Sequence, residues 1–182
     1  MRRPLVVIIA LLLSTSPLLA QDGTIAAYFT QDGVNYSRFV DFAAFSYDAH
    51  IIIYVEDNVE GAAYSLDVVG SGLNLVDHTY PENSFHVGDI LSGVEVGLMN
   101  PVSGQGGQPV FVGTATFFNN IYPNVPNVSF EIMPAELYQT PVYSDGAVLQ
   151  PLSGLVSALG DHAGVVGADE GMTWGRVKAL CR

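Results

Sequence analysis

Cysteine is nearly absent from this chain of 182 residues, whose single thiol is Cys181, next to the C-terminus. No internal disulfide can therefore form. Small secreted domains often depend on such bridges, but a domain of this size buries enough apolar surface without them. A lone thiol so close to the end of the chain is either incidental or available for an intermolecular bridge.

Basic residues are also scarce, since no Lys or Arg lies between Arg38 and Arg176. All 18 acidic residues follow Ala20, whereas only four of the 6 basic residues do, so the chain beyond Ala20 carries a net charge of −14. A surface this acidic repels phosphate groups, which excludes nucleic acid and anionic lipid as partners.

Long apolar runs are missing except at the N-terminus, where Arg2 and Arg3 precede the run Leu5–Leu13. That run is too short to span a bilayer, which needs about 20 apolar residues. A basic start, a short apolar run and a small residue at Ala20 are the parts of a secretory signal. We predict a signal peptide over residues 1–20, cleavage near Ala20 and a secreted protein, extracellular or periplasmic, with no membrane span in its mature part.

The periodicity that indicates a long amphipathic helix is absent between Gln21 and Pro151, and alternation of apolar and polar residues takes its place. Turn signals rich in Gly, Pro, Asn and Asp separate the alternating runs every 10 to 15 residues. This spacing predicts an all-β sandwich, immunoglobulin-like or jelly-roll, of about eight to ten strands over residues 21–152. The expected strands cover residues 24–30, 39–45, 50–55, 63–68, 94–98, 109–118 and 128–132.

The composition changes near Pro151, and residues 153–171 are rich in Gly and Ala. We expect a last strand or a linker there, followed by a short C-terminal helix over residues 172–182. In that helix Trp174, Val177 and Leu180 share one face, and a helix this short is stable only when such a face docks on something. These three residues therefore form a candidate docking tail.

Catalytic motifs are missing as well. The chain has no G-x-S-x-G elbow, no H-E-x-x-H pair and no phosphate-binding glycine loop. His78 and His86 are candidates to approach each other across neighbouring strands, where Asp77 or Asp89 would complete a transition-metal site, but their spacing matches no standard zinc pattern. The sequence thus predicts a protein that is not an enzyme and holds no cofactor.

Carboxylates are the chemical groups that the chain does offer. The segments 30–35 and 56–60 are rich in oxygen ligands, which hard cations such as Ca²⁺ require. Structural calcium is accordingly a hypothesis, with Asp32, Glu56, Asp57 and Glu60 as candidate ligands. Paired carboxylates also serve glycosidases, but a sequence alone does not show which carboxylates face each other.

Tyrosines in polar or proline-rich stretches are the candidate ligand contacts, because an exposed ring stacks on sugars or on partner side chains. Tyr36, Tyr122 and Tyr138 occupy such stretches. The only tryptophan of the chain, Trp174, lies in the tail and offers the β domain no platform.

The run Val59-Glu60-Gly61-Ala62-Ala63-Tyr64-Ser65-Leu66-Asp67-Val68-Val69, followed by Leu73-Asn74-Leu75-Val76, resembles part of cohesin-like and related carbohydrate-binding sandwiches. Gly88-Asp89 and Gly93-Val94-Glu95-Val96 continue the same rhythm. The resemblance implies a secreted sandwich that binds protein or glycan. It carries no binding residues, because Gly70-Ser71-Gly72 stands where those families commonly have an Asp-Pro turn. The tail from Thr173 to Leu180 is similar to C-terminal endings of secreted bacterial proteins of unknown function.

Together these features favour a secreted, non-catalytic binding or interaction module with an extracellular protein or glycan as its partner. Two alternatives stay open at this point. One is a structural subunit of an extracellular or envelope assembly, which the alternating strands and the lysine-poor surface suit. The other is a hydrolase with a site that no sequence motif reveals.

Overall fold

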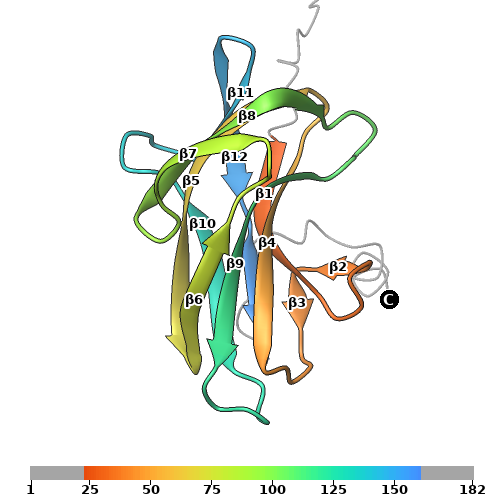
Figure 1. Ribbon diagram of the computed structural model, residues 1–182, viewed down its shortest axis with the longest axis vertical. Helices are drawn as coiled ribbons and strands as arrows, with labels where there is room; N and C mark the ends of the chain where they lie inside the picture. Colours follow the sequence, from red (N-terminus) through yellow and green to blue (C-terminus); the bar gives the residue numbers. More distant parts are fainter. Residues whose placement is uncertain (1–22, 161–182) are drawn as a thin grey trace, which may run out of the picture.

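The computed structural model describes residues 23–160, which form thirteen β-strands and no helix. The order of the strands along the chain is shown in Figure 1. Their bounds are β1 Gly23–Thr30, β2 Tyr36–Ser37, β3 Phe39–Val40, β4 Ser46–Tyr54, β5 Asn58–Ser71, β6 Leu73–Thr79, β7 Ser84–Asp89, β8 Gly93–Ser103, β9 Val110–Asn119, β10 Asn127–Met133, β11 Val142–Asp145, β12 Val148–Gly154 and β13 Val156–Leu159.

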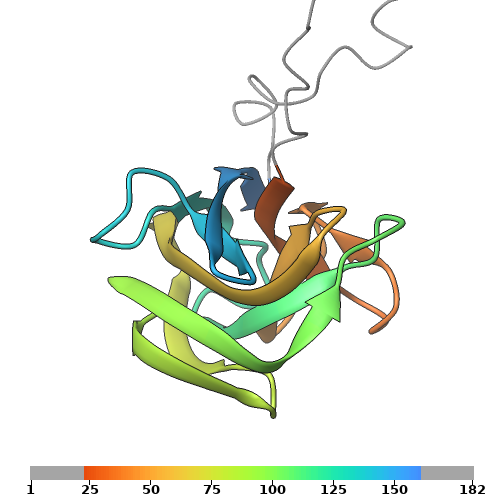
Figure 2. The same cartoon turned by 90° about the horizontal axis from the view of Figure 1, so that it is seen from above.

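The strands build two facing layers. In one layer β1, β4, β9 and β6 pair side by side and antiparallel, and β4, β9 and β6 run together in the lower half of Figure 1. In the other layer β5 is central, because it pairs with β8, β10 and β11, and β7 extends this layer beyond β8. Strand β12 joins the layers, since it pairs with β11 on one side and runs parallel to β1 on the other. Seen from above, β5 and β8 are strongly curved ribbons (Figure 2).

The predicted strands agree with this architecture in most places, and the all-β class is confirmed. The expected strand over 39–45 is wrong beyond Val40, because residues 41–45 leave the sheet. There the Tyr47 hydroxyl donates to the carbonyl of Phe42 at 2.8 Å and accepts from the amide of Ala44 at 3.1 Å. The strand number also exceeds the expected eight to ten, partly because β2 and β3 are only two residues long.

The hydrophobic core lies between the two layers and consists of the inward residues of each alternating strand. Three aromatic rings join its centre: Phe130 of β10 lies 5.0 Å from Phe29 of β1 and 5.4 Å from Phe117 of β9, measured between ring centroids. Tilted and edge-on contacts at this spacing are favourable arrangements for aromatic rings. Phe130 therefore ties the β5–β10 layer to the β1–β4–β9 layer.

Some expectations fall on residues outside the described range. They are the signal peptide over residues 1–20 and the docking tail with its helix over 172–182. The Gly/Ala-rich segment is described as far as residue 160, and there β12 ends at Gly154 and β13 follows. Within residues 23–160 there is no helix with the length and apolar character needed to cross a membrane.

We expect Phe130→Ala to lower the free energy of unfolding by about 3–5 kcal/mol, because the substitution empties the junction between the layers. Met133→Ala is the control on the same strand, since this side chain is 43% exposed, and it is expected to cost well below the core variant. Chemical denaturation measures both values. Equal losses for the two variants would contradict the central role of Phe130.

Candidate functional site

A groove lies on the outer face of the β5 layer, where small residues occupy the middle strands. The strand register places Phe85, Gly97, Gly61 and Ser144 in one row across β7, β8, β5 and β11. The next row is Val87, Glu95, Ala63 and Val142. Side chains on one face of a sheet alternate with those of the other face, so both rows point away from the core. Gly97, Gly61 and Ala63 therefore form the floor of the groove, Glu95 stands beside them on β8, and larger apolar side chains stand on both sides.

Two glycines are essential to this floor. A Cβ added at Gly61 would lie 2.7 Å from the carbonyl oxygen of Val96 and 3.3 Å from Oγ of Ser144. A Cβ added at Gly97 would overlap the ring of Phe85, which lies across the backbone at that point. The missing side chains thus let a neighbouring strand and an aromatic ring approach closely.

The groove has a volume of about 520 Å³ and apolar walls. Three apolar residues on one side of the groove have large exposed fractions: 62% for Phe85, 70% for Val87 and 67% for Met99. On the far side Leu149, which faces Ser144 in the β11–β12 hairpin, is 56% exposed. Apolar side chains gathered around a hollow mark a binding surface more often than scattered ones do.

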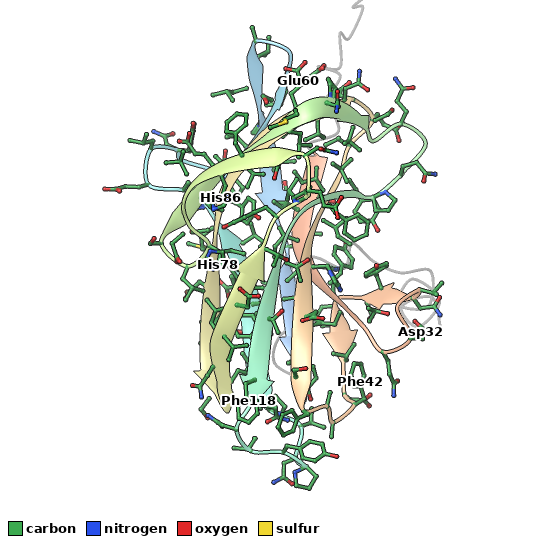
Figure 3. All side chains as sticks on the ribbon, viewed as in Figure 1. Asp32, Phe42, Glu60, His78, His86 and Phe118 are labelled. Atoms are coloured by element: carbon green, nitrogen blue, oxygen red, sulfur yellow. The ribbon has the colours of Figure 1, made fainter. Side chains whose placement is uncertain are left out.

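The charged groups of the groove are all acidic. Glu60 and Glu95 line it, and Glu60 lies near the top of the molecule in Figure 3. Tyr138 reaches over from the loop before β11 and donates from its hydroxyl to Oε1 of Glu95 at 3.3 Å. Burial, together with the Glu95 carboxylate, raises the pKa of Tyr138. No Lys or Arg occurs from residue 39 to residue 160, so these carboxylates face any ligand without basic neighbours.

A side-chain hydrogen bond adds to the backbone pairing of β11 with β5 and β12. The hydroxyl of Tyr143, which is buried, donates to Oδ2 of Asp57 at 2.7 Å. Burial raises the pKa of Tyr143 above its ordinary value, and the Asp57 carboxylate raises it further. Tyr143 therefore stays protonated and keeps donating throughout the neutral and mildly alkaline range.

The three candidate tyrosines lie at three different places. Tyr138 belongs to the groove. Tyr36 lies against the other layer, with its ring centroid 5.4 Å from His50 and 5.4 Å from Phe111. Tyr122 is 53% exposed beyond the end of β9, and its ring lies 6.0 Å from that of Phe45. Only Tyr138 thus contributes to the groove, and the other two flank the opposite sheet.

The candidate calcium ligands each have a partner within the protein or lie apart from the others. Asp32 caps an exposed turn by accepting from the amides of Val34 and Asn35, at 3.0 and 2.8 Å, and these hydrogen bonds hold its pKa below the usual range. Glu56 accepts from the amide of Gly106 at 3.1 Å. In the part of the chain that the structure describes, no three acidic, His or Cys residues gather as a metal site would require. Calcium binding stays a prediction from the sequence.

The two histidines considered for a metal are separated by an aromatic ring. The ring of Tyr80 stacks on His86 with 4.1 Å between centroids and meets His78 edge-on at 5.6 Å. Figure 3 shows His78 and His86 on the same side of the molecule, on the strands that flank Tyr80. The arrangement packs the imidazoles against an aromatic ring and does not direct both of them at one ion.

The glycine floor and the apolar walls of the groove were missed by sequence reasoning. The signal that points to them is the occurrence of apolar residues on the outward side of an edge strand, at Phe85 and Val87, next to Gly97 at an outward position of β8. An alternating pattern shows which residues face outward. It does not show which strands are neighbours, and the register provides that information.

No protein-family model matches the chain, and no curated protein matches it. Among solved structures, a cohesin module from a Clostridium perfringens ATCC13124 family 33 glycoside hydrolase is similar, with a TM-score of 0.52 and 12% identity over 75% of this chain and 94% of that module. The non-cellulosomal cohesin of Archaeoglobus fulgidus matches with 15% identity and a TM-score of 0.40, over 75% of this chain and 90% of that one. The sixth cohesin of Acetivibrio cellulolyticus scaffoldin B, solved in complex with a Cel5 dockerin mutant, matches with 7% identity and a TM-score of 0.47, over 74% and 96%. The β-sandwich described above is cohesin-like in fold.

We expect Tyr143→Phe to lower the free energy of unfolding at neutral pH by about 1–3 kcal/mol, because it deletes a hydrogen bond to a charged group. Urea denaturation measures the loss. Tyr80→Phe is the matched control: the Tyr80 hydroxyl is buried without a hydrogen-bond partner among residues 23–160, so its removal is expected to leave stability unchanged or higher. A larger loss for Tyr80→Phe than for Tyr143→Phe would contradict this reading.

The raised pKa values of Tyr80 and Tyr143 predict that the protein loses stability in alkali. Burial raises the pKa of Tyr80 to about 12, whereas an unfolded tyrosine titrates near pH 10. Between these values the unfolded chain releases protons that the folded chain retains, so the free energy of unfolding falls as the pH rises through this range. Denaturation at pH 9 through 12 would show a smaller fall for Tyr80→Phe than for the natural protein. An identical fall in both would contradict the buried state of the Tyr80 hydroxyl.

Proposed function

We propose that this chain is a secreted, non-catalytic protein-interaction module, and that the groove on the outer face of β5, β8, β7 and β11 binds a segment of a partner protein. The observation that carries the proposal is the floor of Gly61, Ala63 and Gly97 between exposed apolar walls. The two glycines let the walls pack close to the sheet, and the exposed side chains of these walls can bury apolar side chains of a partner on two sides.

The chemistry of the groove specifies the chemistry of the partner. Phe85, Met99 and Leu149 favour apolar side chains opposite them. Removing their exposed apolar area from water is the main source of binding free energy at this surface. Glu60 and Glu95 require cations. The partner segment is therefore apolar on one side and carries Lys or Arg at its flanks.

The test is selection from a random peptide library displayed on phage, with the purified protein as bait. We expect enrichment of peptides that combine large apolar residues with Lys or Arg. Leu149→Arg and Met99→Arg are each expected to lower the affinity for a selected synthetic peptide by at least about tenfold, equivalent to about 1.4 kcal/mol. The reason is that each variant places a cation in the apolar wall and opposes the charge of the peptide.

The matched control is Val76→Arg, which adds the same charge at a side chain that is 60% exposed on β6, in the other layer. Its affinity for the peptide is expected to equal that of the natural protein, as measured by titration calorimetry. Enrichment of peptides that contain no Lys or Arg would overturn the proposal. An equal loss of peptide affinity in Val76→Arg and Leu149→Arg would overturn it too.

A further inference from the structure

The outer face of the opposite layer carries a second kind of surface, over β4, β9 and β6. On this face Phe118 pairs with Ser46 and Asn74, Thr116 pairs with Asp48 and Asp77, and Thr114 pairs with His50 and Thr79. These nine residues, called the polar strip below, form three rows across three neighbouring strands. The residues between them on β9, Ala115 and Phe117, are buried in the core, which confirms that the strip points outward.

We propose that the polar strip binds a neutral polysaccharide chain. This site is separate from the groove, because the two surfaces lie on the outer faces of different layers. The proposal depends on three features of the strip: aromatic rings at both of its ends, hydrogen-bonding groups between them, and a hollow beside one end.

Aromatic rings stand at the lower end of the strip. Phe45 packs edge-on against Phe118 with 4.8 Å between centroids, and Tyr122 packs against Phe45. Phe45 is 62% exposed, and Phe118 is labelled at this end in Figure 3. The C–H face of a sugar ring is apolar and complements the negative face of an aromatic ring. The area of these rings that stays exposed is available to a ligand that covers them.

The middle of the strip offers hydroxyls and carboxylates. The hydroxyl of Thr116 donates to Oδ1 of Asp48 at 2.7 Å, and Oδ1 of Asp77 accepts from the amide of His78 at 2.9 Å. Each of these bonds uses one oxygen of its carboxylate, so the other oxygen is directed to solvent or to a ligand hydroxyl. Carboxylates that accept from hydroxyl groups form strong, charge-assisted bonds, which suits a polyol ligand.

The upper end of the strip opens into a hollow of about 360 Å³, lined by Thr79, Thr114, Tyr80 and Phe111 among others. Threonine hydroxyls and aromatic rings thus meet again about 13 Å from Phe118, taking four residues at about 3.3 Å each along β9. Tyr36 and His50 pack on Phe111 at the same end. The strip therefore has the length for several sugar units in a row, with ring platforms at both ends.

Charge disfavours anionic ligands at the strip, and backbone pairing disfavours an added peptide strand at β9. Asp48 and Asp77 repel anionic glycans and nucleic acid, and the absence of Lys and Arg from residue 39 to residue 160 leaves that repulsion uncompensated. Strand β9 is paired on both sides, with β4 and with β6, so its backbone is not available to an added peptide strand. Among the described strands, β6 pairs with β9 alone and forms the edge of this sheet. A neutral chain of sugars matches the groups that remain.

The experiment measures binding of soluble hexasaccharides of glucose, xylose and mannose to the purified protein by titration calorimetry, with an oligogalacturonate as the anionic comparison. We expect at least one neutral hexasaccharide to bind and the oligogalacturonate not to bind. The double variant Phe45→Ala/Tyr122→Ala is expected to lower the affinity for the sugar by about tenfold or more, because it removes two aromatic rings that would stack on sugar units. Both side chains are exposed, and a melting curve checks that the variant is folded.

Tyr138→Ala is the matched control, since it removes a tyrosine ring from the groove on the other layer. It is expected to leave sugar binding unchanged. The proposal is overturned when none of the neutral hexasaccharides binds the natural protein. Binding that Tyr138→Ala abolishes and Phe45→Ala/Tyr122→Ala does not would overturn it too, because the sugar would then occupy the groove.

Discussion

The close approach of β5 and β8, with Gly61 opposite Gly97, is the constraint on which the outer surface of this protein depends. Neither glycine carries a side chain above the sheet, so the ring of Phe85 lies across the backbone of β8 and the hydroxyl of Ser144 comes near β5. The apolar walls pack close to this floor, and the ring of Phe85 covers Gly97. Any larger residue at either glycine would displace a strand or fill the groove.

The two layers share one core and differ in what they present outside it. The β5 layer presents apolar walls with glutamates, whereas the β4–β9–β6 layer presents hydroxyls and carboxylates between aromatic rings. The alternation along each strand permits this division, because inward residues hold the layers together while outward residues are free to vary. A rigid sandwich can in this way carry two separate binding surfaces.

The sequence predicted the all-β class and the course of most long strands, since alternation along β5, β8 and β10 reports directly which residues face the core. It placed Tyr138 and Glu60 among candidate residues but did not bring them together. Phe85 of β7 and Leu149 of β12 line one groove with β8, β5 and β11 between them, and only the register between distant segments places them in the same row. The end of the expected strand after Val40 was also beyond a local pattern, because the hydroxyl of Tyr47 holds the following loop.

Hydrogen–deuterium exchange in the presence and absence of a selected basic, apolar peptide tests the groove most directly. The account predicts slower exchange on binding for the amides of residues 58–63, 93–99 and 142–149, which form the floor and walls. It also predicts unchanged exchange over residues 46–54 and 110–119 on the other layer. Protection confined to the second set of residues would contradict the assignment of the groove as the protein-binding surface.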